Sequence, residues 1–192
     1  MDKLRAEQIL SEAEALLNGH FLLTSGRHAD KYMQCARVLQ YPKFAEELCA
    51  DIAKSFSGTQ VDFCIGPAMG GIIVSYELAR QLGAKNIFAE RENGAMAIRR
   101  GFSIPKGAKV VIAEDVVTTG GSVVEVIELI RATGAEVVGV AALVDRSNGK
   151  VDFGVPFFAA YSADVVSYEA NDCPICKEGK LPLVKPGSRQ IP

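Results

Sequence analysis

The sequence of 192 residues contains no tryptophan and only two histidines, His20 and His28. It also lacks an excess of charge, because 21 basic and 23 acidic side chains leave a formal net charge of −2. A general nucleic-acid binder usually carries a basic excess, which this composition excludes. No apolar run reaches the ~18 residues of a membrane span, and the charged amino terminus lacks the apolar stretch of a secretory signal. The sequence therefore predicts a cytoplasmic protein without nucleic-acid or membrane partners.

Cysteine is scarce, and its five residues do not form a disulfide framework. Cys35, Cys49 and Cys64 are isolated in regular segments, which predicts buried, small apolar groups. Cys173 and Cys176 form a Cys-Pro-x-Cys pair that resembles one knuckle of a zinc ribbon. A structural zinc site normally takes four ligands, and both histidines lie at the other end of the chain. Two free thiols are the preferred interpretation, and a metal site completed by distant or intersubunit ligands, or a disulfide, are the alternatives.

The stretch Val110–Ser122 combines an apolar strand with a turn of small residues. Its first four residues, Val110–Ala113, are typical of a strand that is buried on both faces. Two carboxylates follow, and then the turn Thr118–Ser122. Beyond the turn, apolar residues recur at helical spacing, namely Val123, Val126, Ile127 and Ile130. The N–H groups of such a turn and the dipole of the following helix predict a phosphate-binding site.

The two carboxylates, Glu114 and Asp115, fit a ligand that carries vicinal hydroxyls or a metal beside its phosphate, as a sugar phosphate does. The alternative is an ordinary strand–turn–helix unit with a solvated acidic pair. The pattern resembles the signature of the type I phosphoribosyltransferases, which bind 5-phosphoribosyl 1-pyrophosphate (PRPP). The resemblance implies that Glu114 and Asp115 hold the ribose hydroxyls of PRPP. It also implies that the 5′-phosphate is bound by Val116, Val117, Thr118, Thr119, Gly120, Gly121 and Ser122.

The amino-terminal segment predicts a cover that lies outside the main sheet. Apolar spacing predicts a helix over Asp2–Leu17, and Asn18-Gly19 is typical of a helix stop. An extended segment, His20–Tyr32, follows and contains a turn at Ser25-Gly26. Its pattern Phe-x-Leu-x-Ser-Gly-x-x-x-x-x-Tyr is similar to the hood of the orotate phosphoribosyltransferase family, although Ser-Gly by itself is a commonplace turn. By that resemblance Ser25 and Gly26 bind orotate.

A second strand–loop–helix unit follows a helix that begins at Pro42. Val61–Ile65 is the predicted strand, Gly66–Gly71 is the loop, and the next helix carries Ile72, Ile73, Tyr76, Ala79 and Leu82. Small residues at this turn make a second candidate anion site, and a plain turn is the alternative. The resemblance implies that the loop contacts the pyrophosphate of PRPP through Ala68, Met69, Gly70 and Gly71.

Three arginines, Arg91, Arg99 and Arg100, lie within ten residues around an Asn93-Gly94 hairpin signal, after a predicted strand at Ile87–Ala89. They are either a solvated ribbon or the local cation cluster that an acidic chain needs for a phosphorylated substrate. Members of the resembled family place a mobile loop here, which carries lysines and a histidine and closes over PRPP from the neighbouring subunit. This segment lacks both residue types. The resemblance therefore assigns Arg91 to PRPP and only makes Arg99 and Arg100 lid candidates.

Arg146 follows a predicted buried strand, Val137–Val144, at the edge where open α/β sheets bind ligands. Its planar guanidinium suits bidentate pairing with a carboxylate. The alternative is an exposed loop arginine paired with Asp145. The resemblance implies that Arg146 holds the carboxylate of orotate, with Thr118 near the same substrate.

Together, these patterns predict an α/β fold with a mostly parallel sheet flanked by helices. Residues 1–40 form a hood, 41–165 the core and 166–192 an extension with the cysteine knuckle. The implied reaction is transfer of the phosphoribosyl group from PRPP to orotate, which yields orotidine 5′-monophosphate and pyrophosphate in pyrimidine synthesis. The implied cofactor is Mg²⁺, held mainly by substrate and water, and the implied assembly is a homodimer. A purine-base phosphoribosyltransferase and a PRPP-sensing regulator are the alternatives.

Overall fold

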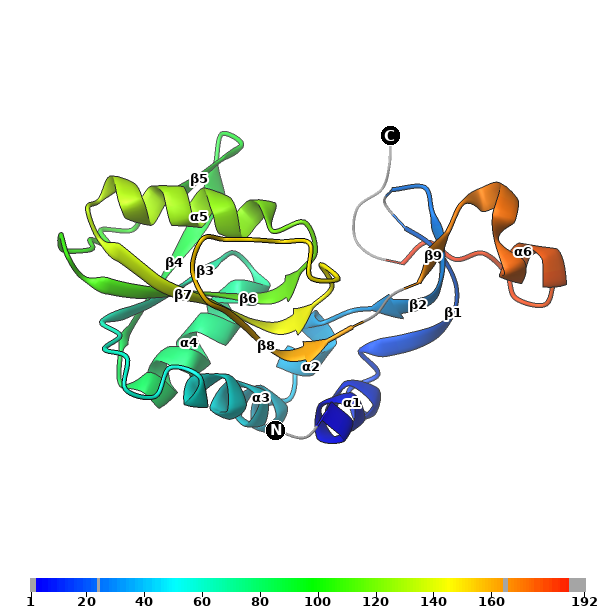
Figure 1. Ribbon diagram of the computed structural model, residues 1–192, viewed down its shortest axis with the longest axis horizontal. Coiled ribbons are helices and arrows are strands. Elements are labelled where there is room, and N and C mark those ends of the chain that lie inside the picture. The colour runs from blue at the N-terminus through cyan, green and yellow to red at the C-terminus, as the bar shows by residue number, and fades with distance from the viewer. Residues whose placement is uncertain (1–2, 24, 164–165, 187–192) are drawn as a thin grey trace.

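A computed structural model describes residues 3–23, 25–163 and 166–186, and it contains two sheets (Figure 1). The larger sheet has the strand order β5-β4-β3-β6-β7-β8. All of its neighbouring strands pair in parallel except β4 and β5. Its strands are β3 (Phe63–Pro67), β4 (Lys85–Glu92), β5 (Ala95–Ile98), β6 (Lys109–Val117), β7 (Glu136–Asp145) and β8 (Phe157–Ser162). This arrangement confirms the predicted fold class.

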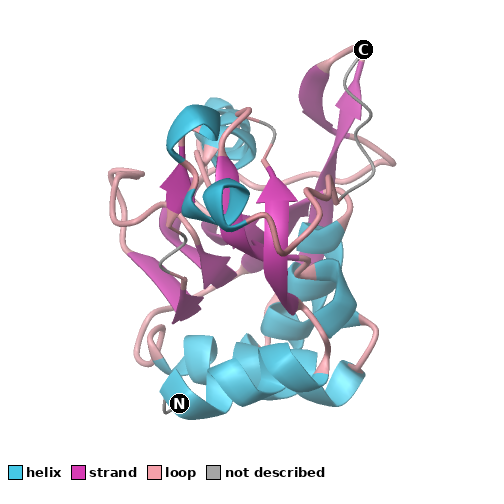
Figure 2. Ribbon diagram, turned by 90° about the vertical axis from the view of Figure 1, so that its right-hand side faces the viewer, coloured by secondary structure: helices cyan, strands magenta, loops and turns pink. Residues whose placement is uncertain are grey.

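Helices cover both faces of the larger sheet, with α5 on one side and α3 and α4 on the other (Figures 1 and 2). Alternate residues of β6 face these two layers, since Val110 and Ile112 pack with α5 while Val111 and Ala113 pack with α3 and α4. All four side chains are fully buried, as predicted. The helices are α1 (Lys3–Glu12), α2 (Ala36–Leu39), α3 (Pro42–Lys54), α4 (Gly70–Leu82), α5 (Gly121–Ala132) and α6 (Pro174–Glu178).

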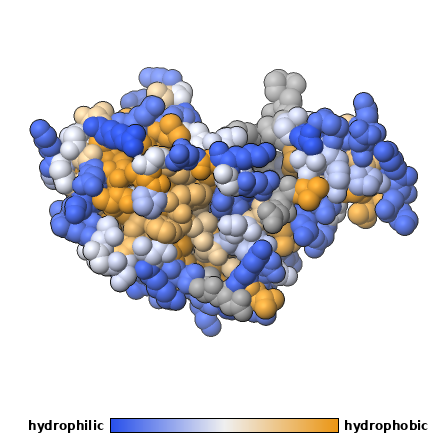
Figure 3. Space-filling model, viewed as in Figure 1, coloured by the Kyte–Doolittle hydropathy of each residue, from blue (hydrophilic) through white to orange (hydrophobic). Residues whose placement is uncertain are grey.

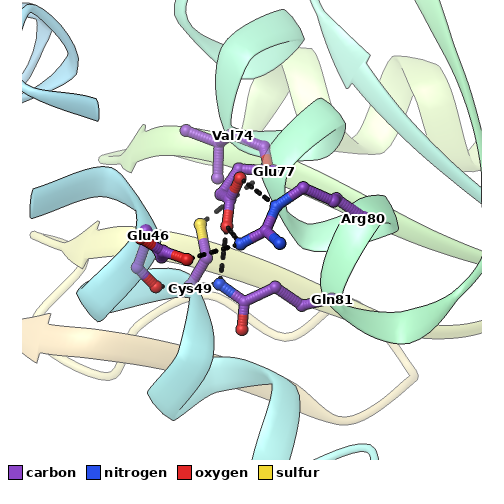
Figure 4. A network of polar contacts seen from close by, with 6 residues as sticks. All are labelled: Glu46, Cys49, Val74, Glu77, Arg80 and Gln81. Carbon is purple, nitrogen blue, oxygen red and sulfur yellow. Dashed lines mark hydrogen bonds and ion pairs between the residues drawn. The ribbon is translucent and has the colours of Figure 1, made fainter. Parts of the chain in front are cut away.

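Polar contacts join α3 to α4 at the surface of the second layer (Figure 4). Arg80 pairs with Glu77 of its own helix and with Glu46 of α3, and Gln81 donates to the backbone carbonyl of Glu46 at 2.8 Å. Below them the buried Cys49 thiol approaches the carbonyl of Val74 at 3.9 Å. The ion pairs are exposed, so apolar burial contributes most of the cohesion between the two helices.

The smaller sheet joins two strands of the amino-terminal part of the chain to one strand of the carboxyl-terminal part (Figure 1). Its order is β1-β2-β9, with β1 at Leu16–Leu22, β2 at His28–Met33 and β9 at Ser167–Tyr168. β2 pairs antiparallel with both neighbours. Farther along, Val184 exchanges backbone hydrogen bonds with β1, because its N–H donates to His20 and its carbonyl accepts from Leu22. The predicted extension therefore packs on the hood, while its residues 187–192 lie outside the described part.

The predicted first helix was wrong at its carboxyl end. α1 ends at Glu12, and Asn18-Gly19 lies inside β1. Glu14 takes a left-handed conformation at φ +49°, with Glu14 N–H donating to Ser11 and Ala15 N–H donating to Leu10. This is a Schellman end built without glycine. The sequence signal was misleading because glutamate rarely occupies that position.

Other local predictions were confirmed. Pro42 is the first residue of α3, and Asn93-Gly94 forms the turn of the β4–β5 hairpin with both residues at positive φ. Cys35, Cys49 and Cys64 are buried, and no disulfide joins any of the five cysteines, all of which lie in the described part of the chain. The carboxyl end of β6 differs from the prediction. The strand continues to Val117, so Glu114 and Asp115 lie within it rather than after it.

Hydrophilic and apolar residues occupy different parts of the face shown in Figure 3. Hydrophilic residues line most of the rim, while apolar residues gather on the left-hand lobe, where Figure 1 places β7, β8 and α5. β8 is the edge strand, and most of its residues are half-buried. Among the described residues, the helices are too short or too polar to cross a membrane.

Candidate active site

A cavity of about 300 Å³ lies where β6 ends and α5 begins. Its lining residues are Arg91, Glu114, Val116, Val117, Thr118, Thr119, Gly120, Gly121, Ser122, Val123 and Glu125. Gly120 caps α5 at φ +75°, and its carbonyl accepts from Val124 N–H at 2.9 Å. An added Cβ there would lie 2.8 Å from Phe153, so this turn requires glycine. The free N–H groups of the helix start then face the cavity, which suits a phosphate.

Backbone hydrogen bonds hold the acidic pair, of which Glu114 lines the cavity. Asp115 N–H donates to Glu114 Oε1 at 3.1 Å, and Val116 N–H donates to Asp115 Oδ1 at 2.8 Å. Burial raises the pKa of Glu114 well above its usual range, and the neighbouring charge of Asp115 raises it further. This direction favours the protonated form of Glu114, and a pair with less negative charge eases the approach of an anionic sugar phosphate.

The glycine loop after β3 lies directly against this acidic pair. A Cβ added to Gly70 would lie 2.3 Å from Asp115 Oδ2, and one added to Gly71 would lie 3.0 Å from Glu114 Oε1. Real Cβ atoms essentially never come closer than 3.0 Å, so a side chain at position 70 would displace Asp115. At position 71 it would also meet the backbone oxygen of Ala113 at 2.9 Å. The structure thus brings the predicted pyrophosphate loop, including exposed Ala68 and Met69, to the predicted ribose site.

The three arginines are all paired with carboxylates. Arg91 forms two hydrogen bonds with Glu125 of α5, at 2.6 and 3.0 Å, and it lines the cavity. Arg100 pairs with Glu90, and Arg99 lies 3.2 Å from Glu92. Of the three, Arg91 is the one that reaches the phosphate turn, whereas Arg99 and Arg100 stay on the hairpin.

Arg146 lies at the neighbouring strand end. Its backbone N–H donates to Val117 O at 2.7 Å, which fixes it beside the phosphate turn. Its Nε is buried without a hydrogen-bond partner among the described residues. Asp145, the alternative partner, instead accepts from Ser147 N–H at 2.7 Å. A buried donor without a partner is costly, so this guanidinium is suited to an acceptor from outside the chain.

Ser25 and Gly26 lie in the turn between β1 and β2, outside the residues that line the cavity. Gly26 takes φ +81°, and its N–H donates to Leu23 O at 2.9 Å. Their predicted contact with orotate stays a prediction.

One cluster of ligating side chains lies outside the cavity, and the sequence had offered it only as an alternative to two free thiols, without assigning its other ligands. His20, His28, Cys173 and Cys176 offer ligand atoms that all lie within 4.8 Å of one another. The pairing of β1 with β2 and of β2 with β9 brings them together. The available signal was compositional, because a Cys-x-x-Cys pair and the chain's only two histidines together make a set of four ligands.

Replacing Glu114 with glutamine tests the protonation of this side chain. Its pKa is raised by folding, so between about pH 4.5 and the folded-state pKa the folded chain binds more protons than the unfolded chain. The free energy of unfolding contributed by Glu114 therefore falls as pH rises through this window. Glu114→Gln should unfold like the native chain at pH 4 and be roughly 1–2 kcal/mol more stable at pH 8.

Urea unfolding at the two pH values measures this difference. Glu128→Gln, at an exposed glutamate of α5, is the matched control. A Glu114→Gln variant whose stability stays parallel to that of the native chain at both pH values would show that Glu114 is ionised in the folded protein.

Comparison with known proteins is consistent with this geometry. The sequence model described as "Phosphoribosyl transferase domain" matches residues 37–153. The chain is 53% identical over 191 residues to an orotate phosphoribosyltransferase of Caldanaerobacter subterraneus subsp. tengcongensis, covering 100% of both chains. It is 58% identical over 183 residues to that of Pelotomaculum thermopropionicum, covering 95% of this chain and 96% of the relative.

A solved structure of an orotate phosphoribosyltransferase has a similar fold. The crystal structure of orotate phosphoribosyltransferase from Aeropyrum pernix matches with a TM-score of 0.68 at 28% identity, over 81% of this chain and 92% of that chain. Full-length relatives, a matching domain and a shared fold thus point to the same family. The chain belongs to the orotate phosphoribosyltransferase family and is a phosphoribosyl transferase enzyme.

Proposed function

We propose that this chain transfers the 5-phosphoribosyl group from PRPP to orotate, giving orotidine 5′-monophosphate and pyrophosphate in pyrimidine synthesis. The observation that carries the proposal is the meeting of three features at neighbouring strand ends. These are the phosphate turn with its acidic pair, the glycine loop packed against that pair, and Arg146 with its buried, unpartnered Nε. The named relatives support the same activity.

Each part of the site has a task in this reaction. Glu114 and Asp115 accept hydrogen bonds from the ribose hydroxyls, and the turn Thr118–Ser122 binds the 5′-phosphate through its N–H groups. The loop at residues 68–71 and Arg91 hold the pyrophosphate. Displacement at the anomeric carbon passes through an oxocarbenium-like state. Catalysis then comes mainly from stabilising the charge of the departing pyrophosphate and excluding water.

The donor set fits Mg²⁺ held mostly by substrate. The acidic pair supplies two carboxylates, and among the described residues the only cluster of three or more potential metal ligands is the separate histidine–cysteine group. Mg²⁺ commonly binds through one or two carboxylates, substrate phosphates and water. When bound, it neutralises charge on PRPP and its leaving group. Glu114 and Asp115 would hold it through the ribose hydroxyls or bridging water.

A homodimer is the proposed assembly. Exposed apolar side chains follow one stripe at the start of α4, with Met69 82%, Ile73 47% and Tyr76 65% exposed. Their spacing places them on one helix face, next to the pyrophosphate loop. Pairing of this face with a second copy would bury the stripe. Arg99 and Arg100 on the hairpin could then act as a lid. Their guanidinium groups would leave the carboxylates of Glu90 and Glu92 and pair with phosphate instead.

An activity assay tests the function. Purified chain with PRPP, Mg²⁺ and orotate is expected to consume orotate, followed by its ultraviolet absorbance, and EDTA should stop the reaction. Asp115→Asn should lower kcat/KM for PRPP by about 10² or more, because one ribose acceptor becomes a donor at the reacting sugar. Glu128→Gln is the matched control. Turnover of adenine, guanine or hypoxanthine but not orotate would favour the purine enzyme, and PRPP binding without any turnover would favour the regulator.

A further inference from the structure

Four side chains from the two ends of the chain converge beneath the smaller sheet. His20 Nε2 lies 3.0 Å from His28 Nδ1, 3.5 Å from Cys173 Sγ and 3.6 Å from Cys176 Sγ. Cys176 Sγ also lies 3.3 Å from His28 Nδ1. His20, His28 and Cys173 are almost fully buried, at 3%, 6% and 0% exposed. These groups lie in the hood, and none of them lines the phosphate cavity.

Four of the six separations among these ligand atoms are close to those of a tetrahedral zinc site, and all four atoms lie within 4.8 Å of one another. Zinc binds imidazole nitrogen at about 2.0–2.1 Å and thiolate sulfur at about 2.3 Å, so ligand atoms at tetrahedral angles lie roughly 3.3–3.8 Å apart. The four distances given above fall in or close to this range. A pair of cysteines with two histidines is also the ligand chemistry that selects zinc among common metals.

The surroundings of His20 orient its ring for metal binding. His20 Nδ1 lies 3.3 Å from the carbonyl oxygen of Leu181. A carbonyl only accepts hydrogen bonds, so Nδ1 carries the proton and Nε2 presents its lone pair to the other three groups. An outer hydrogen bond of this kind typically fixes the tautomer of a metal-binding histidine.

The segment that carries the cysteines has no apolar core of its own, although backbone hydrogen bonds join the chain on either side of it to the hood. Neither the 3-10 helix Ala170–Asp172 nor α6 contains a buried residue, and Leu181 and Leu183 are 50% and 44% exposed. Cys173 is nevertheless completely buried. A short segment without an apolar core normally depends on a disulfide or a metal for its structure, and both thiols are free.

We propose that His20, His28, Cys173 and Cys176 bind one zinc ion, which fastens the carboxyl-terminal segment to the hood. All four positions of the tetrahedron are filled by protein, so the site is structural rather than catalytic. Zinc displaces the thiol protons as it binds, and each cysteine becomes a thiolate ligand. The site is independent of the proposed transfer reaction. Its two histidines lie on β1 and β2, the strands that the Ser25-Gly26 turn joins.

Metal analysis tests the proposal directly. The untagged full chain, purified under reducing conditions and dialysed with zinc and then against metal-free buffer, is expected to retain about one zinc per chain. Cys176→Ser and His28→Gln should each retain less than about a tenth of that amount, since a ligand is lost. Cys49→Ala removes another buried thiol outside the cluster and should retain zinc fully. Circular dichroism establishes that each variant is folded.

A second measurement needs no variant. Cobalt-loaded native chain should show the visible absorption of a tetrahedral site and a thiolate charge-transfer band. Removing zinc with a chelator should lower the melting temperature by roughly 5 °C or more, and adding zinc back should restore it. A native chain that retains no zinc, holds another metal instead, or carries a Cys173–Cys176 disulfide after reducing purification would overturn the proposal.

Discussion

Replacing Arg146 with alanine is expected to raise the KM for orotate by about 30-fold or more, which corresponds to the ~2–5 kcal/mol cost of leaving a buried charge unpaired. The KM for PRPP should stay within a few-fold of native, because the ribose and phosphate contacts lie on β6 and the following turn. Initial rates with each substrate varied in turn separate the two constants. Arg146→Lys should show an intermediate loss, since it keeps the charge but not the planar fork.

The same substitution has a distinctive effect on stability. Arg146 Nε is buried without a partner, so its removal relieves a desolvation cost, and the free energy of unfolding should be unchanged or higher by up to about 1 kcal/mol. Arg131→Ala, at an exposed arginine of α5, is the matched control and should change neither KM nor stability. A large loss of stability with unchanged KM for orotate would make Arg146 a structural residue and refute its role in substrate binding.

The strands and helices around the phosphate site were predictable because their signals are local. Val110–Ala113 is apolar throughout since β6 is buried on both faces, and the helical spacing after Ser122 matches the buried face of α5. The Asn93-Gly94 turn and the helix start at Pro42 follow from the backbone preferences of single residues. In each case, the residues that decide the structure are within a few positions of one another.

Features that depend on tertiary contacts were not predictable in this way. Glu14 ends α1 because its flanking alanines, Ala13 and Ala15, are buried in the core, while the better local signal at Asn18-Gly19 was overridden by strand pairing. The sequence places the three arginines close together on the hairpin, but it gives no hint that Glu125 and Glu90 would pair with them.

The histidine–cysteine cluster shows most clearly what local sequence patterns could not predict. His20 and Cys173 are separated by 153 positions, and each half of the cluster has an ordinary local interpretation. The antiparallel pairing of β2 with β9 and the hydrogen bonds between Val184 and β1 bring the halves together. A chain with few histidines and one Cys-x-x-Cys pair contains the ligands in its composition but not their geometry.

Replacing Gly70 with alanine should lower kcat/KM for PRPP by about 10² or more, because a misplacement of about 1 Å in a catalytic constellation has effects of this size. The new Cβ would lie 2.3 Å from Asp115 Oδ2 and 3.1 Å from Asp115 Cβ, so the whole short side chain must move. Asp115 has little freedom to do so, since its Oδ1 accepts from Val116 N–H at 2.8 Å. The ribose acceptor and the pyrophosphate loop are then displaced together.

Gly121→Ala provides the comparison, because it adds the same methyl group at the start of the other phosphate-binding helix. There, the new Cβ meets only Thr119 Oγ1, at 4.0 Å, so neighbouring atoms need not move and the activity loss should be smaller. Calorimetric titration with PRPP and thermal melting separate binding from folding. Gly70→Ala should bind PRPP more weakly with a melting temperature within a few degrees of native, since Gly70 lies at a helix end rather than in the core. Native PRPP affinity in Gly70→Ala would mean that the position of Asp115 does not matter for ribose binding, and the close contact between loop and acidic pair would then be a packing feature alone.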